Sequence, residues 1–146
     1  MNIRIARVDA ELPAAFEPLR AAASAEGFGF LDRLALRWRA GAYDRDVRAC
    51  VLGAWIGDEF VAVGAQTVDE YDPHPAHRRL RHFYVAPQQR RSGVGRALAS
   101  ALTAEAFAVA PRLHLRATHA VSMAFWDALG FARVSHLSRT HEKVHS

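Results

Sequence analysis

The sequence has a single cysteine, Cys50, among its 146 residues. A disulfide framework and a cysteine-rich metal site are therefore excluded. Cys50 lies in the apolar run at residues 49–52, a context typical of a buried structural thiol rather than a nucleophile. Residues 1–4 lack the apolar core of a signal peptide, and no apolar run approaches membrane-spanning length. We therefore expect a cytoplasmic protein without membrane contact.

The chain also lacks internal repeats, low-complexity linkers and shifts of composition, so residues 1–146 are expected to form a single domain. Its residues are 51% hydrophobic and 23% charged, as is usual for a soluble globular protein. The formal net charge is +4 with neutral histidines, which would attract either nucleic acid or a small polyanion. The arginines are spread along the chain and no aromatic–basic RNA-binding signature is present, so nucleic acid is the less favoured partner.

Hydrophobic periodicity predicts an α/β fold with the element order β-α-α-β-β-β-α-β-α-β. A short strand around Ile3 precedes two helices, the first kinked or broken by Pro18 and the second ending near Gly41. Residues 49–55 and 60–68 are predicted to form a hairpin around a Gly-Asp turn. The later elements are a loop at 69–78, a strand at 80–85, a helix from about 94 to before 111, a strand around 113–115, a helix at 120–129, and one or two strands within 131–145. The strands before and after the long helix should be parallel.

The most informative segment joins the strand at 80–85 to the long helix. Gly93 and Gly95 let the backbone come close to a ligand, and the helix N-terminus offers unpaired N–H groups and a favourable dipole for an anion. Arg90 and Arg91 add positive charge. We expect a diphosphate to bind here, although a flexible turn beside a solvated basic patch is the alternative.

Two common phosphate-binding loops are excluded. A dinucleotide fingerprint needs a third glycine where Leu98 stands, and a P-loop needs Gly-Lys-Ser/Thr where Gly95 is followed by Arg96. What remains, Arg90-x-x-Gly93-x-Gly95, resembles the acetyl-CoA signature Gln/Arg-x-x-Gly-x-Gly/Ala of the GNAT N-acetyltransferases. The preceding Phe-Tyr-Val-Ala-Pro at 83–87 is similar to the Leu-Tyr-Val-x-Pro of that family. The element order also matches, so the resemblance covers nearly the whole chain.

A second segment, residues 119–131, is similar to the family pattern Asn-x-x-Ala-x-x-(apolar)-Tyr-x-x-x-Gly-Phe. Aligned on the Gly-Phe pair, it has His119 at the Asn position, Ser122 at the Ala position and Trp126 at the Tyr position. The family tyrosine is often the general acid, but an indole N–H can only donate a hydrogen bond. No clear general acid therefore remains. Trp126 could pack along the pantetheine arm of the coenzyme, or it could only pack the helix onto the sheet.

The sequence does not identify a general base either. The position that holds a glutamate in some GNAT enzymes, six residues before Val85, holds Arg79, which is not a base at neutral pH. Candidate bases are His82 on the same strand and Glu70, the latter acting through water. Alternatively, His82 is structural, and in-line positioning of the amine with backbone donors at 83–85 carries the reaction.

The resemblance implies a GNAT-like mixed β-sheet flanked by helices and transfer of acetyl from acetyl-CoA to a primary amine of a small molecule or peptide. It also implies the residues that contact acetyl-CoA, which are Phe83, Tyr84, Val85, Arg90, Arg91, Ser92, Gly93, Val94, Gly95, Arg96, His119, Ser122, Phe125 and Trp126. Two other functions stay open: an acetyl-CoA-binding module without catalysis and a basic nucleic-acid-binding domain. A homodimer, common in this family, stays open as well.

The histidines do not predict a metal site. His74 and His77 with Glu70 form one group and His114 with His119 another. Neither group has the spacing of a known ligand set. We therefore expect no metal.

Arg79 and Arg81 share side-chain parity on their strand and should project to one face. If that face lines the cleft, the cations would repel a polyamine and attract an amine that also carries a carboxylate or phosphate. The alternative is that both arginines are solvated or paired with the acidic residues Asp69, Glu70 or Asp72.

Overall fold

The computed structural model describes residues 2–146. In this part of the chain one mixed sheet has the strand order β1-β2-β3-β4-β5-β7-β6. Its strands are β1 (Ile3–Arg7), β2 (Cys50–Ile56), β3 (Glu59–Val68), β4 (His77–Val85), β5 (Arg112–Leu115), β6 (Ala132–Arg133) and β7 (His141–Val144). The helices are α1 (Phe16–Ala25), α2 (Phe30–Arg39), α3 (Ala42–Arg45), α4 (Val94–Phe107) and α5 (Ala120–Ala128), with a short 3₁₀ helix, η1 (Pro87–Gln89).

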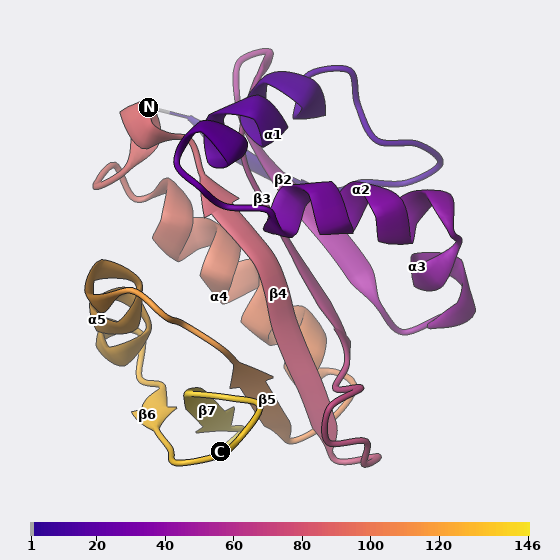
Figure 1. Ribbon diagram of the computed structural model, residues 1–146, viewed down its shortest axis with the longest axis vertical. Coiled ribbons are helices and arrows are strands. Elements are labelled where there is room, and N and C mark those ends of the chain that lie inside the picture. Colours follow the sequence, from indigo (N-terminus) through magenta and orange to yellow (C-terminus); the bar gives the residue numbers. More distant parts are fainter. Residues whose placement is uncertain (1) are drawn as a thin grey trace.

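The helices form a layer on each face of the sheet. Figure 1 shows α1, α2 and α3 in front of the strands and α4 behind them. Leu31 and Leu34 of α2 are fully buried in the front layer with Val63 of β3. Leu98 and Leu102 of α4 are fully buried in the rear layer, to which α5 also contributes. This α/β sandwich is the predicted fold class, and it places β4 at its centre.

β4 and β5 run side by side for only part of their length. They pair in parallel at three positions, ending at Arg79 and His114. β4 continues to Val85, whereas β5 ends at Leu115. Beyond the last pair, no strand of residues 2–146 lies against that side of β4. Apart from the Val85 carbonyl, which accepts from Arg90 Nε, the backbone groups of residues 80–85 on that side are therefore available to a ligand.

A β-bulge lies at the point where the two strands separate. His82 and Phe83 together face Gly64 of β3, and His82 has a left-handed backbone with φ of 57°. Bulges re-aim side chains and often lie beside active sites. A Cβ on Gly64 would lie 2.6 Å from Leu102 Cδ1. Glycine at this position therefore lets α4 pack closely behind the bulge.

Several element boundaries differ from the sequence predictions. The predicted kink at Pro18 is wrong, because α1 begins only at Phe16 and a proline is tolerated in the first turn of a helix. The short helix α3, which follows Gly41, was not predicted. β4 begins at His77, inside the predicted loop, because its pairing with β3 and β5 extends that far. None of the helices within residues 2–146 is both long and apolar enough to cross a bilayer.

Candidate active site

The predicted phosphate loop lies directly beyond the unpaired end of β4. Arg91 and Gly93 both have left-handed backbones, with φ of 64° and 91°, and Gly93 caps α4. The Ser92 hydroxyl donates to the Gln89 carbonyl, which holds the turn. A Cβ on Gly93 would meet no atom within 4 Å. The loop is therefore open to solvent where the first-turn N–H groups of α4 lack helical partners.

Arg90 is not a free cation of this loop. Its two terminal nitrogens donate to Glu26 at 2.9 and 2.6 Å, and its Nε donates to the Val85 carbonyl at 3.2 Å. Tyr84 also donates to Glu26. Hydrogen bonds from Arg90 and Tyr84 lower the pKa of the Glu26 carboxyl. Arg90 thus ties the loop to the end of α1. Arg91 and Arg96 are exposed and, within residues 2–146, form no ion pair, so they are the unpaired cations of the loop.

Helix α5 faces this loop. A Cβ on Gly95 would lie 3.3 Å from the Phe125 ring and 3.4 Å from Val85 Cγ2, so α4, α5 and the end of β4 meet there. His119, the N-cap of α5, is exposed, and its ring centroid lies 5.2 Å from that of Phe28. The fold therefore brings the start of α4, the half-buried Phe125 of α5 and the unpaired end of β4 together.

Trp126 is part of the core. Its side chain is 4% exposed, and its ring lies 4.9 Å from Phe83, 4.9 Å from Phe125 and 5.3 Å from Phe131, centroid to centroid. Phe125 and Ser122 are only half-buried. Trp126 therefore packs α5 onto the sheet, and the half-buried residues of α5 are closer to solvent.

The two candidate bases are poor proton acceptors. His82 Nδ1 bonds the Phe30 carbonyl at 2.9 Å, so Nδ1 carries the proton and Nε2 the lone pair. Burial, together with the charges of Arg81 and Arg37, lowers the pKa of His82 to about 3. Burial acts to raise the pKa of Glu70, but hydrogen bonds from Arg37 and Arg81 outweigh it and leave that pKa below its ordinary value.

Arg79 and Arg81 share one face, as predicted, and both are also paired. Arg79 Nη1 lies 3.6 Å from Asp69 Oδ1, and Arg81 Nη1 donates to Glu70 at 3.0 Å. Both guanidinium groups lie over the Tyr71 ring, at 4.7 and 5.8 Å from its centroid. Even so, Arg79 Nη1 and Arg81 Nε are buried without a hydrogen-bond partner within residues 2–146. This face of β4 therefore keeps unused donors.

Comparison with known proteins decides the family. The model of the acetyltransferase (GNAT) family matches residues 13–131. The chain belongs to the GNAT family. A presumed acetyltransferase from Exiguobacterium sp. 255-15 has 30% sequence identity to this GNAT protein and a TM-score of 0.88, with 99% of this chain and 94% of that one covered. No curated protein matches this chain by sequence.

Two more distant structures have the same fold with a ligand bound. The PaiA N-acetyltransferase of Thermoplasma acidophilum, in complex with coenzyme A, has 14% identity and a TM-score of 0.70, with 99% of this chain and all of that chain (100%) covered. A GNAT acetyltransferase of Elizabethkingia anophelis with acetyl-CoA bound has 14% identity and a TM-score of 0.64, covering 92% and 78%. The predicted GNAT resemblance is thus confirmed, and the chain is an acyltransferase of this family.

Replacing Trp126 with phenylalanine should reduce turnover of this GNAT protein by less than about 100-fold, because the indole is a packing group and not an acid. The loss of contacts in the aromatic cluster should cost about 1–2 kcal/mol of unfolding free energy. Acetyl-CoA turnover and urea unfolding of the variant check both values. A larger loss of turnover at unchanged acetyl-CoA affinity would show that the indole takes part in the chemistry.

One histidine cluster assembles only in the folded GNAT protein. Asp72, His77 and His114 offer ligand atoms within 4.8 Å of one another. His114 Nδ1 bonds Asp69 Oδ2 at 2.7 Å, and His77 Nδ1 bonds the Asp72 backbone carbonyl at 2.9 Å. Arg139 donates to the Asp72 carboxylate at 2.8 Å. The buried Asp69–His114 pair was not predicted, because only the pairing of β4 with β3 and β5 brings the two residues together.

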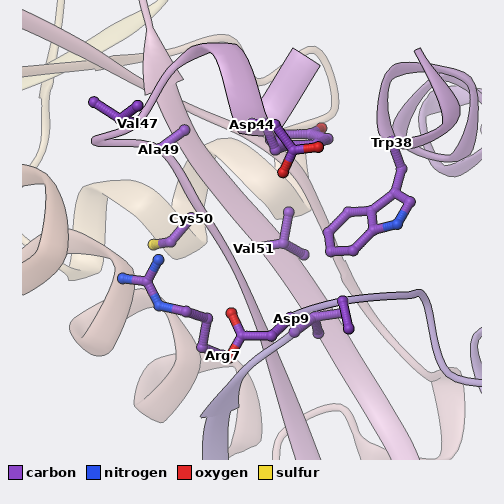
Figure 2. A pocket seen from close by; sticks show the side chains of 11 residues that line it. Arg7, Asp9, Trp38, Asp44, Val47, Ala49, Cys50 and Val51 are labelled. Carbon is purple, nitrogen blue, oxygen red and sulfur yellow. The ribbon is translucent and has the colours of Figure 1, made fainter. Parts of the chain in front are cut away.

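A separate cavity of about 320 Å³ lies on the β1–β2 side of the sheet. Figure 2 shows Trp38 of α2, Asp44 of α3 and Arg7 of β1 around it. Cys50 lies at its wall and is 3% exposed. Cys50 is thus buried, as predicted, and burial raises the pKa of its thiol. No residue of the phosphate loop or of α5 lines this cavity.

Proposed function

We propose that the protein transfers the acetyl group of acetyl-CoA to a primary amine of a small molecule or peptide. The observation that carries this proposal is the unpaired stretch of β4, residues 80–85, beside the N-terminus of α4. Two relatives of the same fold hold coenzyme A and acetyl-CoA. We further propose that residues 1–146 act as one domain, since the sheet begins at Ile3 and ends at Val144.

The coenzyme would bind along this unpaired stretch of β4. We propose that its diphosphate accepts hydrogen bonds from the N–H groups of residues 93–96, with Arg91 and Arg96 contributing charge. The Ala86 N–H donates to Val61 of β3. Because backbone groups alternate along a strand, Phe83 and Val85 then turn theirs away from β3, toward the unpaired side of β4. These N–H groups can bind the pantetheine arm and the thioester carbonyl.

The transfer is then a direct attack. The amine nitrogen forms a bond to the thioester carbonyl carbon, the carbon–sulfur bond breaks, and the proton released by the amine goes to the coenzyme A thiolate, directly or through water. Backbone donors at residues 83–85 would stabilise the developing oxyanion. Holding the amine in line with the thioester supplies much of the remaining acceleration. This route needs no side chain as an acid.

The environment of β4 would also favour deprotonation of the acceptor amine, which reduces the need for a general base. Burial, together with the charges of Arg81 and Arg37, lowers the pKa of His82, and the same burial and charges would lower the pKa of a substrate ammonium placed nearby. A neutral amine, the nucleophilic form, is thereby favoured. We propose that His82 orients this amine by accepting its N–H at Nε2, and that Glu70 holds Arg37 and Arg81 in place.

Release of free thiol from acetyl-CoA tests the function. We expect thiol release that depends on an added primary amine, with one acetylated product per thiol formed, detected by mass spectrometry. The rate should rise with pH as the amine loses its proton. Acetyl-CoA binding without amine-dependent thiol release, across a panel that includes amino acids, alkylamines, polyamines and peptides, would contradict the proposal.

A further inference from the structure

A second cavity, of about 500 Å³, lies beside β4 on the face that carries α2 and α3. It is lined by Arg37, Ala42, Tyr43, Arg45, Asp46, Val47, Thr67, Val68, Glu70 and Arg81. Arg81 immediately precedes the bulge residue His82. The cavity therefore adjoins the part of β4 where the proposed reaction takes place.

Two residues of this cavity keep unused hydrogen-bonding atoms. The Arg81 side chain is 9% exposed, and its buried Nε has no partner within residues 2–146. The buried Tyr43 hydroxyl also has none in the same described range. Burial raises the pKa of Tyr43 to about 12, so the hydroxyl keeps its proton and can donate. Leaving such groups unpaired is costly, which indicates that a ligand or water completes them.

The charges around the cavity favour an anion. Three arginines and two carboxylates line it, an excess of one positive charge. Both oxygens of Glu70 are occupied by Arg37 and Arg81. Asp46 accepts from the Val68 N–H at 2.8 Å and from Arg78, which lies outside the cavity lining, at 3.3 Å. The carboxylates are thus neutralised by these contacts, while Arg45 remains exposed.

We propose that this cavity binds a carboxylate of the amine acceptor, with Arg81 Nε and the Tyr43 hydroxyl as donors. The inference rests on the proposed acetyl transfer and names its substrate class: amines that also carry a carboxylate. Arg81 and the backbone at Phe83 are separated only by the bulge residue His82, so they lie at most about 7 Å apart along the strand. The acceptor should therefore carry its amine and carboxylate a comparable distance apart, as 5-aminopentanoate does.

A matched pair of acceptors tests the proposal. Thiol release is measured with 5-aminopentanoate and with pentylamine, which has the same chain length and no carboxylate. The wild-type kcat/KM should favour 5-aminopentanoate at least about tenfold, the effect of one charge-assisted contact. Arg81→Gln should abolish this preference. The exposed Arg133 of β6, which pairs with Asp127 of α5, supplies the control Arg133→Gln, which should retain it.

Tyr43→Phe is the second variant, because it deletes a hydroxyl that has no partner and should leave Tm unchanged. It should reduce the preference for 5-aminopentanoate about threefold or more. Equal kcat/KM for both acceptors in the wild type, or a preference unchanged in both variants, would overturn the carboxylate site and leave the acetyl transfer intact.

Absence of thiol release with either acceptor would count against the proposed function instead. Calorimetric titration of the wild type, with coenzyme A present, then tests the carboxylate site independently of turnover. Binding of 5-aminopentanoate at least about tenfold tighter than pentylamine, and lost in Arg81→Gln, would support it. Equal binding of the two compounds would overturn it.

Discussion

Replacing Gly93 with aspartate is expected to weaken acetyl-CoA binding by about 100-fold or more. Gly93 caps α4 with φ of 91°, and the space around it is open. A carboxylate there would occupy the position proposed for the diphosphate and repel it in a partly desolvated site. The added charge would also compete for the first-turn N–H groups of α4. Calorimetric titration with acetyl-CoA measures the loss.

The matched control for this substitution is Gly93→Asn. Asparagine has the shape of aspartate and tolerates the left-handed conformation equally well, but it carries no charge. Any cost from the backbone or from bulk therefore appears in both variants, and the difference between them reports on charge. We expect Gly93→Asn to bind acetyl-CoA much more tightly than Gly93→Asp. Equal affinities in two folded variants would show that the diphosphate lies elsewhere.

Asp69→Asn is expected to cost about 3 kcal/mol or more of unfolding free energy. Asp69 is 1% exposed. Its carboxylate accepts from His114 Nδ1 at 2.7 Å and from the Tyr71 N–H at 3.1 Å, and it faces Arg79 at 3.6 Å. Removing its charge leaves the Arg79 guanidinium buried without a counter-ion. Urea unfolding near pH 7 measures the change.

The same carboxylate should make stability depend on pH. Burial acts to raise the pKa of Asp69, but the His114 hydrogen bond and the charge of Arg79 outweigh it, so the pKa lies below its ordinary value of 3.8. The stabilisation is therefore complete above pH 3.8 and is lost as pH falls through the lowered pKa. Wild type should lose more stability on acidification than Asp69→Asn.

Asp32→Asn is the control for both measurements. Asp32 pairs with Arg20 at 2.9 Å, but its side chain is 48% exposed, so its removal should cost less than about 1 kcal/mol. A similar small cost for Asp69→Asn would mean that the buried pair contributes little to holding β4 and β5 together.

Local patterns in the sequence were sufficient for the order of the main elements, α3 excepted, and for the position of the glycine-containing loop at residues 90–96. The hairpin at 49–68, the long helix after Gly93 and the glycine cap at Gly130, with φ of 89°, depend on neighbours in the chain. Short-range periodicity and turn chemistry therefore predicted them. The error at Pro18 arose because periodicity placed the start of the helix too early, whereas α1 begins only at Phe16. The error at the start of β4 arose because pairing with β3 and β5 overrides local preference.

The sequence by itself thus determined the α/β fold class, the GNAT resemblance and the loop at residues 90–96. Only the tertiary structure decided the role of each polar side chain. It placed Trp126 in the core, bound Arg90 to Glu26 and lowered the pKa of His82 to about 3. These outcomes depend on burial and on charges from elements far apart in the chain. Such long-range effects set the free energy of protonating a side chain or of forming an ion pair, and no local sequence pattern encodes them.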